Sequence, residues 1–285
     1  MNAGPHPVLL VGENHAEGLH DLAERKILQE AAARGYDTLM LEKPNNLQEP
    51  LQAYLRSARK PEDWRAVIDF YLEALYPVPA ASAPRAGWRG RLDRRRQERG
   101  AEERRLFLQE EGEALARGSW RYQLRGLAEE AERRGLRTVL CDVPASPDYL
   151  AMSRQEKRVL EGVAPRNAFM AERIAAEARA GHGVLMIGGL HHLDDALTPG
   201  SSLKLELERR GVPSLTFALG RPAFGKWEES RRERKLLDEL YRRVDYVETA
   251  LGRTVAQALQ ERGIGFRRAG EAGGAAPGGG PAREK

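Results

Sequence analysis

Five short apolar runs, separated by longer segments with helical spacing, constrain the fold of this chain more than any other feature. The runs are continuous rather than alternating, which is typical of strands that are covered on both faces. The sequence therefore predicts an α/β fold with a mainly parallel sheet and helices on both faces. The runs begin at Val8, Thr38, Thr138, Val184 and Ser214.

A glycine stands between a helical segment and the next apolar run in three places, at Gly35, Gly135 and Gly211. Glycine is favoured there because it readily adopts the left-handed conformation that ends many helices. Helix, glycine and strand repeated in this way indicate parallel pairing. In such sheets ligands bind outside the carboxyl ends of the strands. We therefore expect functional residues directly after the apolar runs.

Two kinds of region depart from this pattern. Residues 45 to about 125 contain helical stretches and no strand-like run, which predicts a helical insertion, or cap, after the second strand. Residues 227–263 predict one or two surface helices, and the Gly-, Ala- and Pro-rich residues 269–285 predict a disordered tail. We expect one α/β domain over residues 1–268.

Composition narrows the class of protein. A single cysteine, Cys141, excludes an internal disulfide framework and favours a reducing compartment. The chain has no run of eighteen apolar residues, and residues 1–12 do not resemble a signal peptide, so we expect a cytoplasmic protein without a membrane span. A formal net charge of +4 with 31% charged residues indicates a solvated surface and leaves the oligomeric state open.

Acidic and imidazole side chains stand where each strand should end. Because the carboxyl ends of parallel strands meet at one edge of a sheet, we expect these side chains to lie close together. Imidazoles with carboxylates suit a divalent metal ion, which lowers the pKa of a bound water and polarises a carbonyl. For each acidic residue singly, capping of the following turn stays open as the alternative, and for each histidine a structural or solvated position stays open. The residues are Glu13 and His15, Glu42, Asp142, and His191 with His192.

The first and fourth runs repeat one phrase. VLLVGENH (8–15) and VLMIGGLH (184–191) align without a gap, with Gly12 opposite Gly188 and His15 opposite His191. The repeat favours His191 as the counterpart of His15. His192 remains the alternative, because the chain also reads Gly-x-x-His when it is counted one residue later.

The segment 165–174 adds a basic group. Arg166 and Asn167 stand at the start of a predicted helix, directly after a proline. Arg166 can bind a substrate carboxylate or phosphate, or stabilise an oxyanion. It can equally form a structural ion pair with Glu42 or Asp142, and both readings stay open.

Taken together, these residues resemble the superfamily that unites erythromycin esterases, ChaN-like haem-iron-binding proteins, and the TraB and TIKI proteins. The shared motifs are a Gly-Glu-x-His after the first run, a Glu closing the second, an Arg-Asp/Asn-x-x-Met-Ala helix and a late Gly-x-x-His. Here they are residues 12–15, Glu42, 166–171 and 188–191. The ChaN-like members are the most similar, because His20 is also kept, and the resemblance covers roughly residues 8–195.

The resemblance implies a parallel α/β core and a metal-dependent hydrolase that cleaves an ester or amide bond of a small-molecule or peptide substrate. It implies ligand or acid–base roles for His15 and His191, and ligand or general-base roles for Glu13 and Glu42. Arg166 would hold the substrate or brace a carboxylate. Further side chains that could support the site or join it as ligands are His20, Asp142, Asn167 and His192.

The resemblance also leaves open a haem- or iron-binding protein without catalysis. Haem as a cofactor would need an axial His or Tyr that faces an apolar slot. The candidates in the cap are Tyr71, Tyr76 and Tyr122.

The arginine-rich segment 85–105 raises nucleic-acid binding as a third possibility, with Trp88 stacked on a base. Acidic residues interleave with the arginines at Glu98, Glu102 and Glu103. This mixture is more typical of a solvated helix. We therefore rank nucleic-acid binding behind hydrolysis and behind haem or iron binding.

Overall fold

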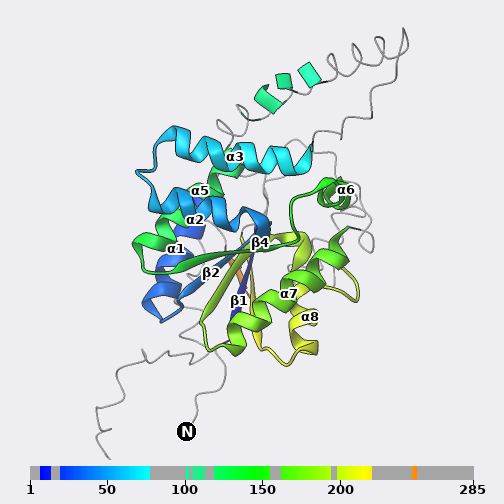
Figure 1. Cartoon of the computed structure of the whole chain (residues 1–285). Coiled ribbons are helices and arrows are strands. Elements are labelled where there is room, and N and C mark those ends of the chain that lie inside the picture. The colour runs from blue at the N-terminus through cyan, green and yellow to red at the C-terminus, as the bar shows by residue number, and fades with distance from the viewer. Residues whose placement is uncertain are drawn as a thin grey trace, which may run out of the picture.

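The structure is a computed structural model of the 285-residue chain (Figure 1). It describes residues 7–13, 20–77, 101–102, 105–106, 108–110, 112, 119–154, 162–193, 198–219 and 246–248. For residues 20–23, 119–123, 153–154 and 246–248 it describes the backbone alone.

Strands and helices alternate along most of the described chain, as the apolar runs predict. The strands are β1 (Val8–Glu13), β2 (Thr38–Pro44), β3 (Arg137–Asp142), β4 (Val184–Gly189), β5 (Ser214–Leu219) and β6 (Tyr246–Glu248). The helices are α1 (His20–Ala33), α2 (Gln48–Arg56), α3 (Pro61–Leu75), α5 (Ser119–Arg133), α6 (Pro147–Arg154), α7 (Val163–Arg179) and α8 (Leu203–Arg209). Two 3-10 turns, η1 (Asn45–Leu47) and η2 (Leu190–His192), follow β2 and β4 directly.

The described strands form one sheet with the order β3-β2-β4-β1-β5-β6, and every pairing is parallel. All five predicted strands are confirmed. β6 is an addition, because Tyr246 pairs with Phe217 of β5 and Glu248 with Leu219. The helix predicted over this stretch is therefore wrong for residues 246–248. A three-residue strand is too short to show a period of its own.

Helices cover both faces of the sheet, which confirms the predicted fold class. One apolar cluster packs α1, α2, α3 and α5 against one face, and a second packs α7 and α8 against the other. Figure 1 shows α1, α2 and α5 on one side of the strands and α7 with α8 on the opposite side. The single cysteine, Cys141, is buried in the second cluster.

Left-handed glycines end the helices where the sequence predicts them. Gly35 after α1 has a φ of 90°, and Gly135 after α5 has a φ of 75°. Behind Gly35, the Tyr36 amide donates back to the Ala31 carbonyl at 3.1 Å. This pattern satisfies a free carbonyl of the last helical turn and directs the chain into the next strand.

The helical insertion after β2 is confirmed for α2 and α3, whereas residues 78–100 of it lie outside the described residues. The insertion is fixed to the edge strand β3. Gln48 at the start of α2 donates to the Thr138 carbonyl at 2.9 Å and accepts from the Leu140 amide at 2.7 Å. One side chain thus takes the place of a neighbouring strand on the open edge of β3. Asn46 pairs in the same two-bond manner with the backbone of Ala145, at 2.8 and 3.1 Å.

Several predictions lie outside the described residues. They are the tail 269–285, the surface helices over 227–263 apart from 246–248, and the arginine-rich segment apart from residues 101, 102 and 105. Within the part of the chain that is described, no helix combines the length and the hydropathy needed to cross a membrane.

Candidate functional site

The two strands that carry the repeated phrase are neighbours in the sheet. β1 pairs with β4 in the same register as the gapless sequence alignment, with Gly12 opposite Gly188 and Glu13 opposite Gly189. The repeat therefore places two glycines side by side at the carboxyl end of the sheet, where a parallel sheet binds its ligands.

Close packing explains both glycines. A Cβ on Gly188 would lie 2.8 Å from Oε2 of Glu42 and 3.0 Å from its Cβ. A Cβ on Gly12 would clash with Leu193 and Leu190, which belong to the turn that follows β4. The repeat thus makes room for the Glu42 carboxylate beside β4 and for this turn beside β1.

Arg166 joins the ends of β2 and β3 through two carboxylates. Its Nη2 donates to Oε1 of Glu42 and to Oδ2 of Asp142, at 2.5 Å in each case. Its Nε lies 3.1 Å from both oxygens of Asp142. The side chains of Arg166, Glu42 and Asp142 are 2, 5 and 0% exposed. Of the two acids expected as alternative partners, Arg166 pairs with both.

Burial and charge act in opposite directions on these groups. Burial lowers the pKa of Arg166, but the charges of Glu42 and Asp142 outweigh it and raise the pKa above its ordinary value. The guanidinium therefore stays charged. For Asp142 the same burial raises the pKa, because it disfavours the charged carboxylate, and the neighbouring charge of Arg166 opposes that shift.

His192 extends this cluster toward α7. Its Nε2 lies 3.0 Å from Oε1 of Glu42, and its Nδ1 lies 2.5 Å from Oδ1 of Asn167. The Asn167 amide donates to the Ser201 carbonyl at 2.7 Å. The other oxygen of Glu42, Oε2, accepts from the Gly189 amide at 2.6 Å. Both oxygens of Glu42 therefore have donors from the protein.

Five of the residues singled out from the sequence come together here, and we name them the buried polar network. They are Glu42, Asp142, Arg166, Asn167 and His192. The sequence analysis missed Tyr149 of α6, whose ring lies 5.4 Å from the Arg166 guanidinium carbon. An aromatic residue soon after the third strand was its only signal in the sequence.

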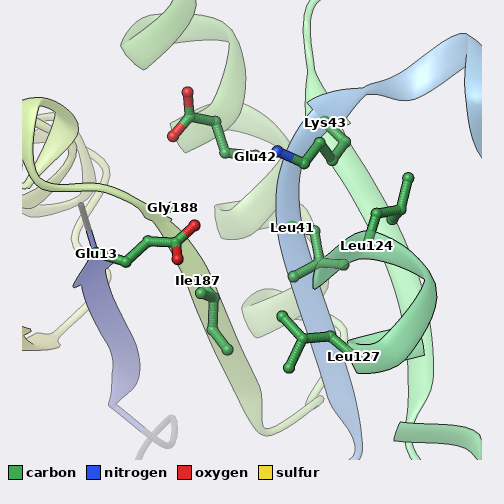
Figure 2. Close-up of a pocket in the computed structure, with 8 residues that line it drawn as sticks. All are labelled: Glu13, Leu41, Glu42, Lys43, Leu124, Leu127, Ile187 and Gly188. Carbon is green, nitrogen blue, oxygen red and sulfur yellow. The ribbon is translucent and has the colours of Figure 1, made fainter. Parts of the chain in front are cut away.

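Glu13 lies apart from this network, on the other face of the sheet. The residues Leu9 and Val11 belong to the cluster under α5, and strand alternation turns Glu13 the same way. Figure 2 shows Glu13 reaching from β1 across the end of β4, whereas Glu42 points away from Leu124 and Leu127 of α5. A pocket opens between them, lined by Glu13, Leu41, Glu42, Lys43, Leu124, Leu127, Ile187 and Gly188.

The predicted histidines have different positions. His192 is 2% exposed, whereas His191 is exposed on η2, where its carbonyl accepts a hydrogen bond from the Thr198 hydroxyl. His15 lies outside the described residues, and His20 is the first residue of α1, without a described side chain. The two adjacent histidines thus divide into one buried in the network and one at the surface.

A divalent metal ion in a protein site needs several converging ligand side chains. Among the described side chains, no three of His, Cys, Asp or Glu are grouped to hold a metal ion. Both oxygens of Glu42 are engaged, and the predicted ligand His15 is not described. The described residues alone therefore do not supply the predicted ligand set.

The tyrosines considered for haem are part of the packing of the cap. Tyr71 and Tyr76 are half-buried and pack against the apolar clusters around α3. The side chain of Tyr122 is not described. Of the arginine-rich segment, Arg105 forms an exposed ion pair with Glu102 at 2.7 Å, as in a solvated helix.

The fold and the site define an α/β protein with an all-parallel sheet and a buried acid–base network at its carboxyl edge. No family model matches the chain, and no curated protein matches it. One solved structure that it resembles is described as the type III effector HopBA1, with 16% sequence identity and a TM-score of 0.39. That match covers 77% of this chain and 79% of the other. A similarity of this size assigns neither a family nor a function.

Proposed function

We propose that this protein is a hydrolase that cleaves an ester or amide bond at the carboxyl ends of β1, β2 and β4. The observation that carries the proposal is the pocket at these strand ends, which Glu13 lines together with Glu42 of the buried polar network. Taking charged groups out of water costs several kcal/mol per ion, and the attraction between them repays this only where the geometry is good and further hydrogen bonds are made. Clusters of this kind concentrate at functional sites. The resemblance to the erythromycin esterase, ChaN-like and TraB–TIKI superfamily supports the same chemistry.

The two pocket carboxylates have different roles in this proposal. Glu42 is held by donors on both oxygens, so it orders the edge of the sheet and does not exchange protons with substrate. Glu13, at the end of β1, lines the pocket beside Lys43 and acts as the general base toward the attacking water. His191, exposed after β4, donates a proton to the leaving group.

Arg166 has a positioning role, because its side chain is too buried to meet a substrate. It neutralises Glu42 and Asp142 and holds the ends of β2 and β3 in fixed relation to each other. α5 supplies one apolar wall of the pocket through Leu124 and Leu127, and Leu41 of β2 and Ile187 of β4 supply the rest.

The test is hydrolysis of a panel of p-nitrophenyl esters and short peptide anilides by wild-type protein and two variants. Glu13→Gln and His191→Ala should each lower kcat/KM by about 100-fold or more, as loss of a general base or acid does. The matched controls are Glu208→Gln, at an exposed acid of α8, and His182→Ala, at a histidine that precedes β4 at the amino ends of the strands. Both controls should keep full activity. A folded wild-type protein that cleaves nothing in the panel would refute the proposal.

The same preparations test the predicted cofactors. Elemental analysis of the wild type and of a His15→Ala, His191→Ala double variant measures bound divalent metal. A stoichiometric ion that is lost in the double variant would support the metal-dependent form of the proposal, and full activity in excess chelator would contradict it. A Soret band in the absorption spectrum would instead favour the haem-binding alternative.

A further inference from the structure

We propose that Asn167 is a positioning residue that fixes the ring of His192 so that its Nε2 is held against the Glu42 carboxylate. The inference rests on the proposed function for its catalytic meaning. Its structural content can be tested without any activity.

The hydrogen-bond directions around Asn167 follow from what each group can donate. The Ser201 carbonyl can only accept, so the Asn167 Nδ2 amide must face it, at 2.7 Å. The Asn167 oxygen then faces His192 and can only accept from it, at 2.5 Å. The Nδ1 atom of His192 therefore carries a hydrogen.

The other ring nitrogen is then directed at Glu42. Nε2 of His192 lies 3.0 Å from Oε1 of Glu42, and a stable contact between these two atoms needs a hydrogen between them. If the His192 ring were rotated by half a turn about its Cβ–Cγ bond, carbon atoms instead of nitrogens would face Asn167 and Glu42. Because His192 is 2% exposed and Asn167 is fully buried, water does not replace either contact.

The function of this arrangement is to complete the set of polar contacts around Glu42. Arg166 donates to Oε1, which Nε2 of His192 also contacts at 3.0 Å, and the Gly189 amide donates to Oε2. Asn167 thus acts on Glu42 through His192, and Glu42 in turn forms part of the pocket wall beside Glu13. The anchor of Asn167 is Ser201, in the turn that leads into α8, so that turn also supports the site.

The first readout is a long-range proton–nitrogen NMR spectrum of protein labelled with 15N-histidine, with His192 assigned from a His192→Gln variant. Wild-type protein should show a protonated Nδ1 on His192. Asn167→Leu, which is similar in size and cannot form hydrogen bonds, should lose this signature. Asn167→Asp keeps an acceptor oxygen toward Nδ1 and should retain it. The His182 signals provide an internal reference. His182 pairs with Asp37 at the amino ends of the strands, away from Asn167, so its signals should not change.

The second readout is kinetic and uses a substrate from the ester and anilide panel. Asn167→Leu should lower kcat by about 10- to 100-fold with little change in KM, as small displacements of catalytic groups do, and Asn167→Asp should recover part of the loss. A neutral His192 protonated on Nε2 in wild type, or an unchanged signature in Asn167→Leu, would overturn the inference. If Asn167→Leu does not fold, the same spectrum of wild type and Asn167→Asp decides.

The two proposals fail in different ways. The expected nitrogen signature without any hydrolysis would refute the proposed function and leave the positioning role of Asn167 in place. Hydrolysis that depends on Glu13, combined with a His192 signature that does not depend on Asn167, would refute the positioning role alone.

Discussion

Arg166 is the residue on which the buried polar network depends most. Its guanidinium lies between the carboxylates of Glu42 and Asp142, and its other flank is covered by the ring of Tyr149. Each carboxylate would be costly to bury without a cation beside it. The stability of the carboxyl ends of β2 and β3 therefore depends on Arg166, a side chain of helix α7.

Replacing Arg166 by Met should lower the free energy of unfolding by about 3–5 kcal/mol, because two buried carboxylates lose their partner. Urea denaturation at neutral pH measures this loss. Arg105→Met, which breaks an exposed pair with Glu102, should have no measurable effect. An Arg166→Met variant as stable as the control would show that the network is not held by charge.

Glu13 and Glu42 stand at the ends of their strands as the sequence predicts, but the sequence does not predict the face on which each side chain lies. The chain places both Glu13 and Glu42 at strand ends, as predicted, yet their side chains leave the sheet on opposite faces. In a continuous apolar run both faces are buried, so the pattern does not reveal which face a terminal acid takes. The choice between the two readings of Arg166 likewise depended on how α7 is oriented, which no local pattern encodes.

At the scale of elements, the cap and the sheet are joined by side chains rather than by backbone. Gln48 occupies the open edge of β3 with one donor and one acceptor. Tyr54 of α2 donates a hydrogen bond to Glu129 of α5, and Arg125 of α5 lies 5.4 Å from the centre of the Tyr54 ring. These contacts hold the insertion against the core.

Gln48→Ala should expose the edge of β3. The Leu140 amide loses its acceptor, so its hydrogen exchange should become faster by about 10-fold, the equivalent of one hydrogen bond. Exchange measured by NMR or mass spectrometry reports this directly. Gln52→Ala is the matched control, because Gln52 reaches the same strand only through a 3.5 Å contact with Thr138. Unchanged exchange at Leu140 would mean that Gln48 does not protect the edge.

Tyr54 should make the cap sensitive to alkaline pH. Burial, and then the hydrogen bond to Glu129, raises the pKa of Tyr54 from 10.0 to about 12. A group whose pKa is raised on folding contributes stability below its unfolded pKa and loses it as the pH rises through the folded pKa. Urea midpoints of wild type should therefore fall relative to Tyr54→Phe between pH 10 and pH 12. Parallel curves for the two proteins would argue against this coupling.

Elements with a strong local pattern were predictable, and the others were not. The five strands with continuous apolar runs and the left-handed glycines at Gly35 and Gly135 follow directly from the sequence. β6 was not predictable, because Tyr246–Glu248 is short and is stabilised by pairing with β5. Tyr149 was missed for a related reason, since its role comes from contact with a distant arginine.

At the scale of the whole molecule, the strand order is the feature that the sequence does not show. β4 lies between β2 and β1, and β5 lies on the other side of β1. Pairing between distant segments depends on the packing of the entire chain, so apolar runs predict strands without predicting their neighbours. The repeated phrase is an exception, because its two copies turn out to be paired in register.

This strand order affects how the protein forms during synthesis. β1 is made before the other described strands, and its neighbours β4 and β5 are made only after β2 and β3. A nascent chain must therefore keep an apolar strand unpaired on both edges until most of the domain exists, which favours late folding and transient binding by chaperones.

A fragment that ends at Gly162 should be digested rapidly by proteases that leave the full chain intact. A resistant fragment would show that β2 and β3 can form a stable core before the site exists.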